Sequence, residues 1–271
     1  MFKLFPLIFV LALTTTACST DTGTAGAPSA AKADDSQSAA LRLAQANAAN
    51  APQAVTDAVR KLAPHATIQS IVQTPIPGLY QVIASGQVVY VSADGRYMLQ
   101  GNAYDLKTHT DLSDAQMDRL RREALATVSP AQMLRFAPPH PKYTVTVFTD
   151  IDCPYCREFH RHIADYNAAG IAVDYLFWPR SGLDTPSYDK AVSVWCAADR
   201  KRAFTAAKAG VDPKPATCAN PVRHDFELGL DLGVDGTPSI IAGNGALIGG
   251  YATPRDLLQR LQTVHAPASG G

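Results

Sequence analysis

The chain has 271 residues, which is long for one compact domain and suits two small ones. Hydrophobic residues make up 46% of it and charged residues 18%, so a globular core can form. Lys+Arg and Asp+Glu both number 24, and this balance provides no global basic field of the kind that attracts nucleic acid. We therefore expect no nucleic-acid partner.

The N-terminus predicts export through a signal peptide at residues 1–18. MFKLFPLIFVLALTTTAC has one lysine, an apolar run over residues 4–13 that is too short for a permanent membrane span, and then small residues. Its end, TTAC, resembles a lipobox, although that pattern prefers Leu where Thr15 stands. Lipidation of Cys18, which would tether the protein to a membrane, and ordinary cleavage after Ala17 both stay open. In either case disulfides can persist in the compartment that the protein reaches.

Residues 19–50 are rich in Ala, Ser, Gly and Asp, which predicts a disordered tether. Residues 51–110 predict a small α+β domain: a helix over residues 51–64, then short runs of β-branched and aromatic residues. QVVYVSADGRYMLQG predicts a hairpin with Asp94-Gly95 at its turn. Such a domain is small for a free-standing core, and an exposed sheet edge would invite pairing with a second copy. We expect it to be a dimerisation domain.

Residues 111–137 predict a linker helix between two domains. The pattern favours a helix from about Ser113 to Thr127, with Ser113 and Gln116 as a capping box. Charged residues dominate most of its surface, as in a solvent-bridging helix. The Pro-rich segment APPHPK at residues 137–142 marks the next boundary.

Residues 138–265 predict a thioredoxin-like catalytic domain, followed by a tail at residues 266–271. TVTVFTDI and IAVDYLFW are buried strands, and between them a Cys-x-x-Cys motif opens a helix to about Ala169. A helical region, a hairpin formed by GTPSIIA and ALIGGY, and a closing helix with a Thr cap follow. The order β-α-β-α-α-β-β-α suits an α/β thioredoxin fold with a helical insert.

The motif Cys-Pro-Tyr-Cys predicts a redox-active pair. Cys153 would lie near a helix N-terminus, where free N–H groups and the helix dipole favour a thiolate. Pro154 suits the first turn, and Cys156, less exposed, could attack a mixed disulfide formed at Cys153. A zinc site would need further ligands, and His160 and His162 offer the wrong helical geometry. A purely structural disulfide in so small a loop would gain little stability. We predict no cofactor beyond this redox-active pair, and no metal.

Two further cysteines and one proline complete the candidate residues. Without Cys18, four cysteines allow three pairings, and spacing favours Cys153 with Cys156 and Cys196 with Cys218. A disulfide between Cys196 and Cys218 would stabilise the folded protein by roughly 3 kcal/mol, which favours a structural role over a redox-active one. Thr237-Pro238 enters a predicted strand, where proline cannot donate to the ladder. A cis bond beside the motif explains it, and a trans proline on an edge strand is the alternative.

Three polar residues near the motif are predicted to be supporting rather than catalytic. We expect Asp150 and Asp152 to be solvated or capping rather than proton carriers, and His160 to lie on a helix surface. The sequence identifies no buried acid beside Cys156.

Several strings together resemble the DsbC/DsbG family of periplasmic thiol:disulfide interchange proteins, and more closely its DsbC members, over about residues 51–264. They include YTVTVFTDIDCPYC, AVSVWCAADRKRAF, LGVDGTPSII and GQVVYVSADGRYMLQGNAYDL. The resemblance implies a periplasmic, V-shaped homodimer whose redox sites face an apolar cleft for misfolded or misoxidised exported proteins. It also implies that a DsbD-like membrane reductant keeps the site as a dithiol.

The resemblance also assigns roles to residues of this chain. Cys153 matches the family nucleophile and Cys156 its resolving partner, Thr237 and Pro238 match the substrate-binding loop, and Cys196 with Cys218 matches the structural disulfide. The dipeptide Pro-Tyr departs from the Gly-Tyr common in DsbC and is familiar from DsbG. The long N-terminal tail is a second departure.

We therefore expect a disulfide isomerase and reductase. Three alternatives stay open: a DsbG-like reductase that protects single cysteine thiols, a DsbA-like oxidase, and a redox-independent chaperone.

Overall fold

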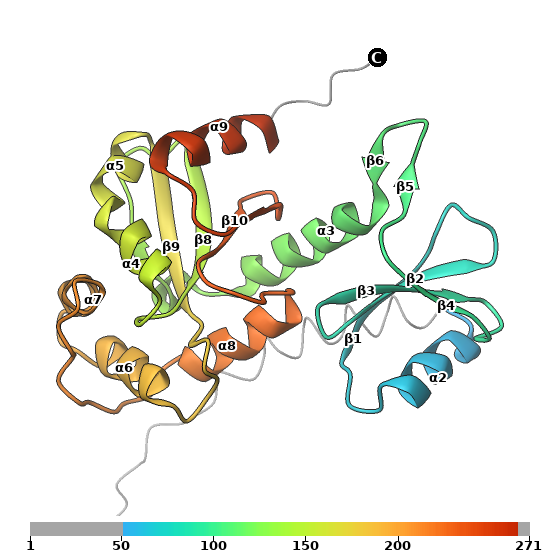
Figure 1. Cartoon of the computed structure of the whole chain (residues 1–271), viewed down its shortest axis with the longest axis horizontal. Helices are drawn as coiled ribbons and strands as arrows, with labels where there is room; N and C mark the ends of the chain where they lie inside the picture. The colour runs from blue at the N-terminus through green and yellow to red at the C-terminus, as the bar shows by residue number, and fades with distance from the viewer. Residues whose placement is uncertain (1–50, 265–271) are drawn as a thin grey trace, which may run out of the picture. The chain divides into compact units, whose positions relative to one another are not determined.

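The computed structural model describes residues 51–264 (Figure 1). The predicted signal peptide with Cys18, the predicted tether and the tail at residues 266–271 lie outside the described residues. Over the described range, no helix combines the length and the apolar character that a membrane crossing requires.

The small N-terminal domain is one helix against a four-stranded antiparallel sheet. Its elements are α2 (Gln53–Leu62), β1 (Ile68–Gln73), β2 (Leu79–Ala84), β3 (Gln87–Ser92) and β4 (Met98–Gln100), with the strands in that order across the sheet. Its core is aliphatic and consists of Val55, Val59, Ile71, Val82 and Val91.

The hairpin predicted around Asp94-Gly95 is the pair β3 and β4. Val91 pairs with Met98, so the connection is longer than a two-residue turn. Gly95 has a φ of 68°, and a Cβ there would lie 2.4 Å from the carbonyl oxygen of Ala54. Glycine is therefore required at this position by both its backbone conformation and the close approach of α2.

A two-stranded ribbon, β5 (Tyr104–Asp105) with β6 (Thr110–Asp111), leads into the linker helix α3 (Leu112–Thr127). The helix bounds agree with the prediction, but the predicted cap is wrong. Asp111 is the N-cap, and its carboxylate accepts from the N–H groups of Ser113 and Asp114. Ser113 is buried instead, with its hydroxyl 2.6 Å from that of Tyr90.

The second sheet begins inside the segment that was predicted as linker. A 3₁₀ turn, η1 (Pro130–Gln132), precedes the short strand β7 (Leu134–Phe136), which pairs antiparallel with β9 (Ile171–Phe177). Sequence reasoning missed β7 because three residues are too few to carry a period-2 pattern.

The five-stranded sheet has the order β11-β10-β8-β9-β7. Its remaining strands are β8 (Tyr143–Thr149), β10 (Ser239–Ala242) and β11 (Leu247–Gly249); β8 and β9 are parallel, and the other neighbours are antiparallel. Every residue of β9 is buried, as expected for a strand covered on both faces. In β8, alternate side chains point to opposite faces of the sheet and enter two different cores, Val147 one and Phe148 the other.

Helices cover this sheet (Figure 1): α4 (Pro154–Arg161), α5 (Ile163–Ala168), α6 (Pro186–Trp195), α7 (Arg200–Lys208), α8 (Val222–Asp231) and α9 (Pro254–Val264). The helix predicted to run unbroken to Ala169 is divided at His162, which separates α4 from α5. The insert between β9 and β10 contains the three helices α6, α7 and α8. As predicted, Thr253 caps the closing helix, accepting from the N–H of Asp256 at 3.2 Å.

Candidate active site

The Cys-Pro-Tyr-Cys motif lies where β8 ends and α4 begins. Cys153 is the N-cap of α4, Pro154 is its first residue, and Cys156 is in its first turn. β10 runs antiparallel to β8 with Ser239 opposite Phe148, so the residues before Ser239 meet the residues after Phe148. This register brings the sequence-predicted segments together, although they are about eighty residues apart in the chain.

The loop before β10 contacts the first cysteine directly. The Cys153 thiol donates to the Thr237 carbonyl oxygen at 3.2 Å. The Thr237–Pro238 peptide bond is cis. The Thr237 hydroxyl is buried and has no hydrogen-bond partner. A thiolate at Cys153 would supply an acceptor for this hydroxyl, which is one of the groups that lower the pKa of Cys153.

The two thiols of the motif, both free and buried, have opposite acidities. The pKa of Cys153 is lowered to about 5, chiefly because the Cys156 thiol donates a hydrogen bond to it. The Cys156 backbone N–H and the charge of Arg180 act in the same direction, while burial opposes them. The pKa of Cys156 is strongly raised, first by burial and then by that same hydrogen bond. One sulfur is therefore a ready nucleophile, and the other stays protonated until something deprotonates it.

Asp150 is buried beneath the motif, so of the two expected roles, solvated or capping, the structure excludes the solvated one. Only 2% of the residue is exposed. Its carboxylate accepts from the Ser187 hydroxyl at 2.7 Å and from the N–H groups of Asp152 and Arg180 at 2.7 and 2.8 Å. Burial raises the pKa of Asp150, but these hydrogen bonds outweigh it, so the pKa is lowered. Asp150 ties the turn before Cys153 to the segment after β9 and to α6.

Asp152, by contrast, lies at the surface as expected. It forms ion pairs with Arg157 at 3.1 Å and Lys190 at 3.0 Å, and about a third of each of these side chains is exposed. Such pairs contribute little to stability.

His160 is a core residue, so its predicted place on a helix surface is wrong. It is 3% exposed, and its ring nitrogens lie 3.1 Å from the Tyr175 hydroxyl and 3.0 Å from the Thr205 hydroxyl. Burial lowers its pKa to about 4, and the charge of Lys208 adds to the effect. The imidazole is thus neutral near neutral pH.

Lys208 is a buried group near the motif that sequence reasoning missed. It is 4% exposed, at the last residue of α7, and its ammonium donates to the Thr149 hydroxyl and the Asp150 carbonyl. One local signal distinguishes Lys208 from the exposed Lys201 of the same helix. Lys208 follows the buried Phe204 by four residues, so the two side chains share one face of α7.

The outer side of the motif carries an exposed aromatic side chain. Tyr155 is 66% exposed, and its ring centroid lies 6.3 Å from that of Tyr251. Exposed aromatic side chains of this kind can contribute to contacts with protein partners.

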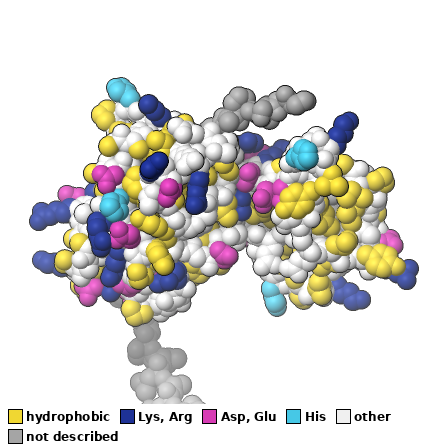
Figure 2. Space-filling model, turned by 45° about the horizontal axis from the view of Figure 1, so that its top comes forward, with side chains coloured by type: hydrophobic (Ala, Val, Ile, Leu, Met, Phe, Trp, Pro, Cys, Tyr) yellow, Lys and Arg dark blue, Asp and Glu magenta, His cyan; other side chains and the backbone are white. Residues whose placement is uncertain are grey.

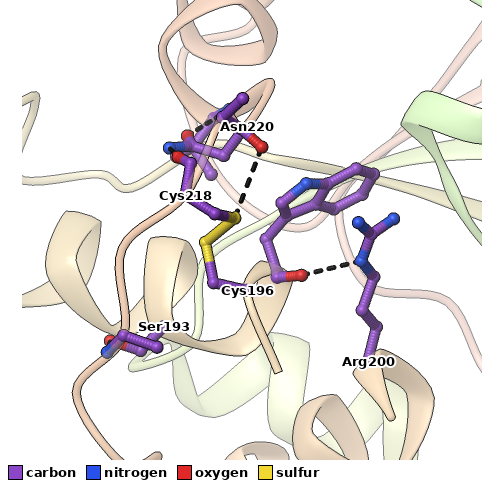
Figure 3. The surroundings of a disulfide bond; sticks show 9 residues. Ser193, Cys196, Arg200, Cys218 and Asn220 are labelled. Carbon is purple, nitrogen blue, oxygen red and sulfur yellow. Dashed lines mark hydrogen bonds between the residues drawn. A yellow bond between two sulfur atoms is a disulfide. The ribbon is translucent and has the colours of Figure 1, made fainter. Parts of the chain in front are cut away.

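Cys196 and Cys218, the pair that spacing favours, form a disulfide across 22 positions of sequence (Figure 3). Cys196 is the C-cap of α6, and Cys218 lies in the loop before α8. The Ser193 hydroxyl accepts from the N–H of Ala216 at 3.2 Å, which fixes the same loop to α6 a second time. Within residues 51–264, no cluster of three His, Cys, Asp or Glu side chains could hold a metal ion.

Two family models match the chain. The description of the first is "Disulfide bond isomerase protein N-terminal domain", and it matches residues 44–114; the second, "Thioredoxin-like domain", matches residues 130–265.

Similar proteins include the thiol:disulfide interchange protein DsbC of Dickeya dadantii, which is 37% identical over 198 residues, 73% of this chain and 82% of that protein. The protein of the same name from Escherichia coli is 35% identical over 196 residues, 72% of this chain and 82% of its own. Among solved structures, a disulfide interchange protein from Neisseria gonorrhoeae is 28% identical, with a TM-score of 0.45, over 50% of this chain and 99% of that one.

Proposed function

Because this chain belongs to the DsbC family of thiol:disulfide interchange proteins, we propose that it is a disulfide isomerase and reductase that uses Cys153 and Cys156 to reshuffle wrong disulfides in exported proteins. One observation supports this assignment above the others. Cys153 combines an N-cap position, a lowered pKa and contact with the Thr237 loop, while Cys156 keeps its proton. This is the division of labour that thiol–disulfide exchange requires.

The first step is attack by the Cys153 thiolate on one sulfur of a client disulfide. A bond forms between Cys153 and that sulfur, the client disulfide breaks, and the other client sulfur leaves as a thiolate. The helix N-terminus and the Thr237 hydroxyl stabilise the negative charge on Cys153 before the attack.

Two outcomes can follow the mixed disulfide. In isomerisation, a different client cysteine attacks the client sulfur bound to Cys153, a new client disulfide forms, and Cys153 leaves as a thiolate, so no net electrons are exchanged. In reduction, Cys156 loses its proton and attacks Cys153, the enzyme disulfide forms, and the client leaves with two additional electrons. The high pKa of Cys156 slows this second route and leaves time for rearrangement.

The substrate-binding role of Thr237 and Pro238 is part of this proposal. The loop contacts Cys153, and the exposed Tyr155 lies on the same motif, so an extended client segment can meet both. The role of Cys196–Cys218 is to hold the insert helices, with no part in the exchange. No cofactor is needed beyond the Cys153–Cys156 pair itself.

The proposed setting is the periplasm, with a homodimer as the working form and a DsbD-like membrane reductant restoring the dithiol. The small domain supports dimerisation because its edge strand β4 is exposed along its whole length. Tyr97 and Leu99 are more than half exposed there, and hydrophobic side chains gather on the surface of this domain (Figure 2). Lipidation of Cys18 would tether the same dimer to a membrane.

Recovery of activity from a ribonuclease with scrambled disulfides tests the proposal. Wild type should restore activity well above a small-thiol control, Cys153→Ser should restore none, and Cys156→Ala should retain part of the isomerase activity. No recovery with wild type would overturn the isomerase assignment. If Cys153 still reduced sulfenic acids on folded proteins, the Pro-Tyr dipeptide would instead favour protection of single thiols, as in DsbG. Client protection by Cys153→Ser alone would favour a redox-independent chaperone.

A further inference from the structure

Lys208 is a buried amine close to the redox pair that disulfide exchange, as described above, does not use. Its Nζ donates to the Thr149 hydroxyl at 2.7 Å and to the Asp150 carbonyl at 2.6 Å. Thr149 ends β8, and the chain from there to Cys153 is a short turn. The amine therefore lies under the segment that presents both sulfurs.

A buried ammonium normally requires a negative partner, and Lys208 has none among the carboxylates. No ion pair of Lys208 with Asp or Glu occurs within the described part of the chain. Burial lowers its pKa to about 8, and the groups that oppose this shift are Cys156 first, then Asp150 and Cys153. Because an isolated buried charge is costly, the sulfur of Cys156 becomes a counter-charge for this amine once Cys156 is ionised, in addition to Asp150.

The remaining charged and titratable neighbours lie on α4. Arg157 lowers the pKa of Lys208 further, and His160 is neutral because its own pKa is lowered by burial and by Lys208. Neither group can neutralise the ammonium. The interaction is reciprocal, since the charge of Lys208 is the largest effect that lowers the pKa of Cys156 against burial.

The hydroxyl of Thr149 connects the two groups. It accepts from Lys208, and it is also a hydrogen-bond partner that favours the Cys156 thiolate. A hydroxyl has one donor and two acceptor positions, so it can accept a proton from one neighbour while giving its own to the other. The Thr149 hydroxyl can therefore relay one proton between Cys156 and Lys208.

We propose that Lys208 removes the proton of Cys156 through the Thr149 hydroxyl and then, as an ammonium, stabilises the Cys156 thiolate that resolves the mixed disulfide. This role deepens the proposed function and rests on it. Lys208 is a positioning residue in this scheme, because only Cys156 touches the reacting sulfur.

The step is balanced in protons and electrons. Neutral Lys208 gains the proton as Cys156 becomes a thiolate, and Cys156 attacks Cys153 of the mixed disulfide. The new bond joins Cys153 to Cys156, the bond from Cys153 to the client breaks, and the client sulfur leaves as a thiolate that takes a proton from solvent. The enzyme thiols are oxidised, and the client disulfide is reduced.

Before the next cycle, the Lys208 ammonium must lose one proton to return to its neutral form. Lys208 is one of the residues that line a pocket of about 560 Å³ between α4 and α7, whose walls include Arg161 and Thr205.

The expected pH dependence follows from the amine. The relay needs neutral Lys208 to accept the proton, so the resolving rate should rise with pH and level off above about 8, the pKa of Lys208. Without the amine, Cys156 must lose its proton to hydroxide at a much higher pKa. The rate should then be lower and keep rising across the accessible range.

Stopped-flow mixing of the reduced protein with an aromatic disulfide, whose released thiolate absorbs visible light, separates the two attacks. The first release reports Cys153, and the second release reports Cys156 attacking the mixed disulfide. Lys208→Met and Thr149→Val are compared with Lys201→Met, which makes the same chemical change on the exposed face of α7. Circular dichroism checks that each variant is folded, and Thr149→Val serves on its own if Lys208→Met does not fold.

We expect the rate of the first release to equal that of wild type in all variants. In Lys208→Met, the second release should be about a hundredfold slower near pH 7, and its rate should reach no plateau as the pH rises. Thr149→Val should slow the second release with Lys208 still in place, and Lys201→Met should change neither phase. A second release in Lys208→Met with the wild-type rate and plateau overturns the proposal. Failure of the proposed function is distinguishable, because it shows as no recovery of the scrambled ribonuclease with wild type, whichever way the second release responds to Lys208→Met.

Discussion

The two cysteine pairs of this chain contain the same side chains and differ in every feature of their surroundings. Cys153 and Cys156 lie three positions apart at the N-terminus of α4, free and with pKa values moved in opposite directions. Cys196 and Cys218 lie 22 positions apart, one at the C-terminus of α6 and one in a loop, and form a disulfide. The helix end matters, because its N-terminus stabilises a thiolate and its C-terminus does not.

The surroundings of the pairs differ as much as their positions. Beneath the first pair lie three buried polar residues, Asp150, His160 and Lys208, all hydrogen-bonded. The second pair joins a helix end to a loop, with Arg200 nearby (Figure 3), and Arg200 donates to the carbonyl of Trp195. Burying titratable groups is costly, and such groups concentrate where acidity must be tuned. The comparison therefore separates a free pair, which we propose reacts with clients, from a bonded pair that links a helix end to a loop.

Alkylation rates should give the largest difference. With the pKa of Cys153 lowered to about 5, its thiolate predominates near pH 6, whereas Cys156 remains protonated. Iodoacetamide should therefore modify Cys153 more than about a thousandfold faster than Cys156 in the reduced protein, and Cys196 and Cys218 not at all. Peptide mass spectrometry over a pH series measures each rate. Equal rates at both sulfurs of the motif would remove the basis for a nucleophile and a resolver.

Removing the second pair should affect stability and leave reactivity unchanged. In the double variant Cys196→Ala, Cys218→Ala, the lost constraint on a loop of 22 positions should lower the free energy of unfolding by roughly 3 kcal/mol. Urea unfolding measures this loss, and the alkylation midpoint of Cys153 should stay near its wild-type value. A shifted midpoint would mean that the two pairs are coupled through α6, and the separation drawn here would fail.

Acid should destabilise the region beneath the reactive pair through His160. Its pKa falls from 6.5 to about 4 on folding, so the unfolded chain binds the proton first as pH falls. Stability is then lost between about pH 6.5 and 4, and the share from His160 should be roughly 2 kcal/mol between pH 7 and 5. His160→Gln should remove this share from urea unfolding curves at the two pH values.

His162→Gln is the matched control for that measurement. His162 is partly exposed, and hydrogen bonds to Asp165 and Glu158 raise its pKa, so its contribution has the opposite sign. If the free energy of unfolding falls as much between pH 7 and pH 5 in His160→Gln as in wild type, the assignment of a neutral, buried imidazole is contradicted.

These residues also mark how far sequence reasoning reached. The helix α3 and the Cys-Pro-Tyr-Cys turn could be predicted because each depends on local pattern and turn chemistry. The burial of Asp150, His160 and Lys208 could not, because it depends on which distant segments pack over them: α6 over Asp150, and α7 beside His160. The prediction of the α3 cap was wrong for the same reason. The hydroxyl of Ser113 contacts that of Tyr90 in β3, so Ser113 is buried and does not cap the helix. Local rules thus located the two sulfurs of the motif, and tertiary contacts supplied the buried polar groups around them.

The smallest expected effect concerns the support of the structural pair. Trp195 immediately precedes Cys196. Arg200 donates from Nε to the Trp195 carbonyl at 2.7 Å, and its guanidinium carbon lies 4.0 Å from the centroid of the Trp195 ring. Arg200→Met should lower the free energy of unfolding by about 1 kcal/mol, whereas Arg202→Met, on the exposed face of the same helix, should have almost no effect. Repeating Arg200→Met without the disulfide completes a double-mutant cycle. If the arginine and the disulfide hold the same helix end, the two losses should not add, and strict additivity would show that they stabilise different parts of the insert.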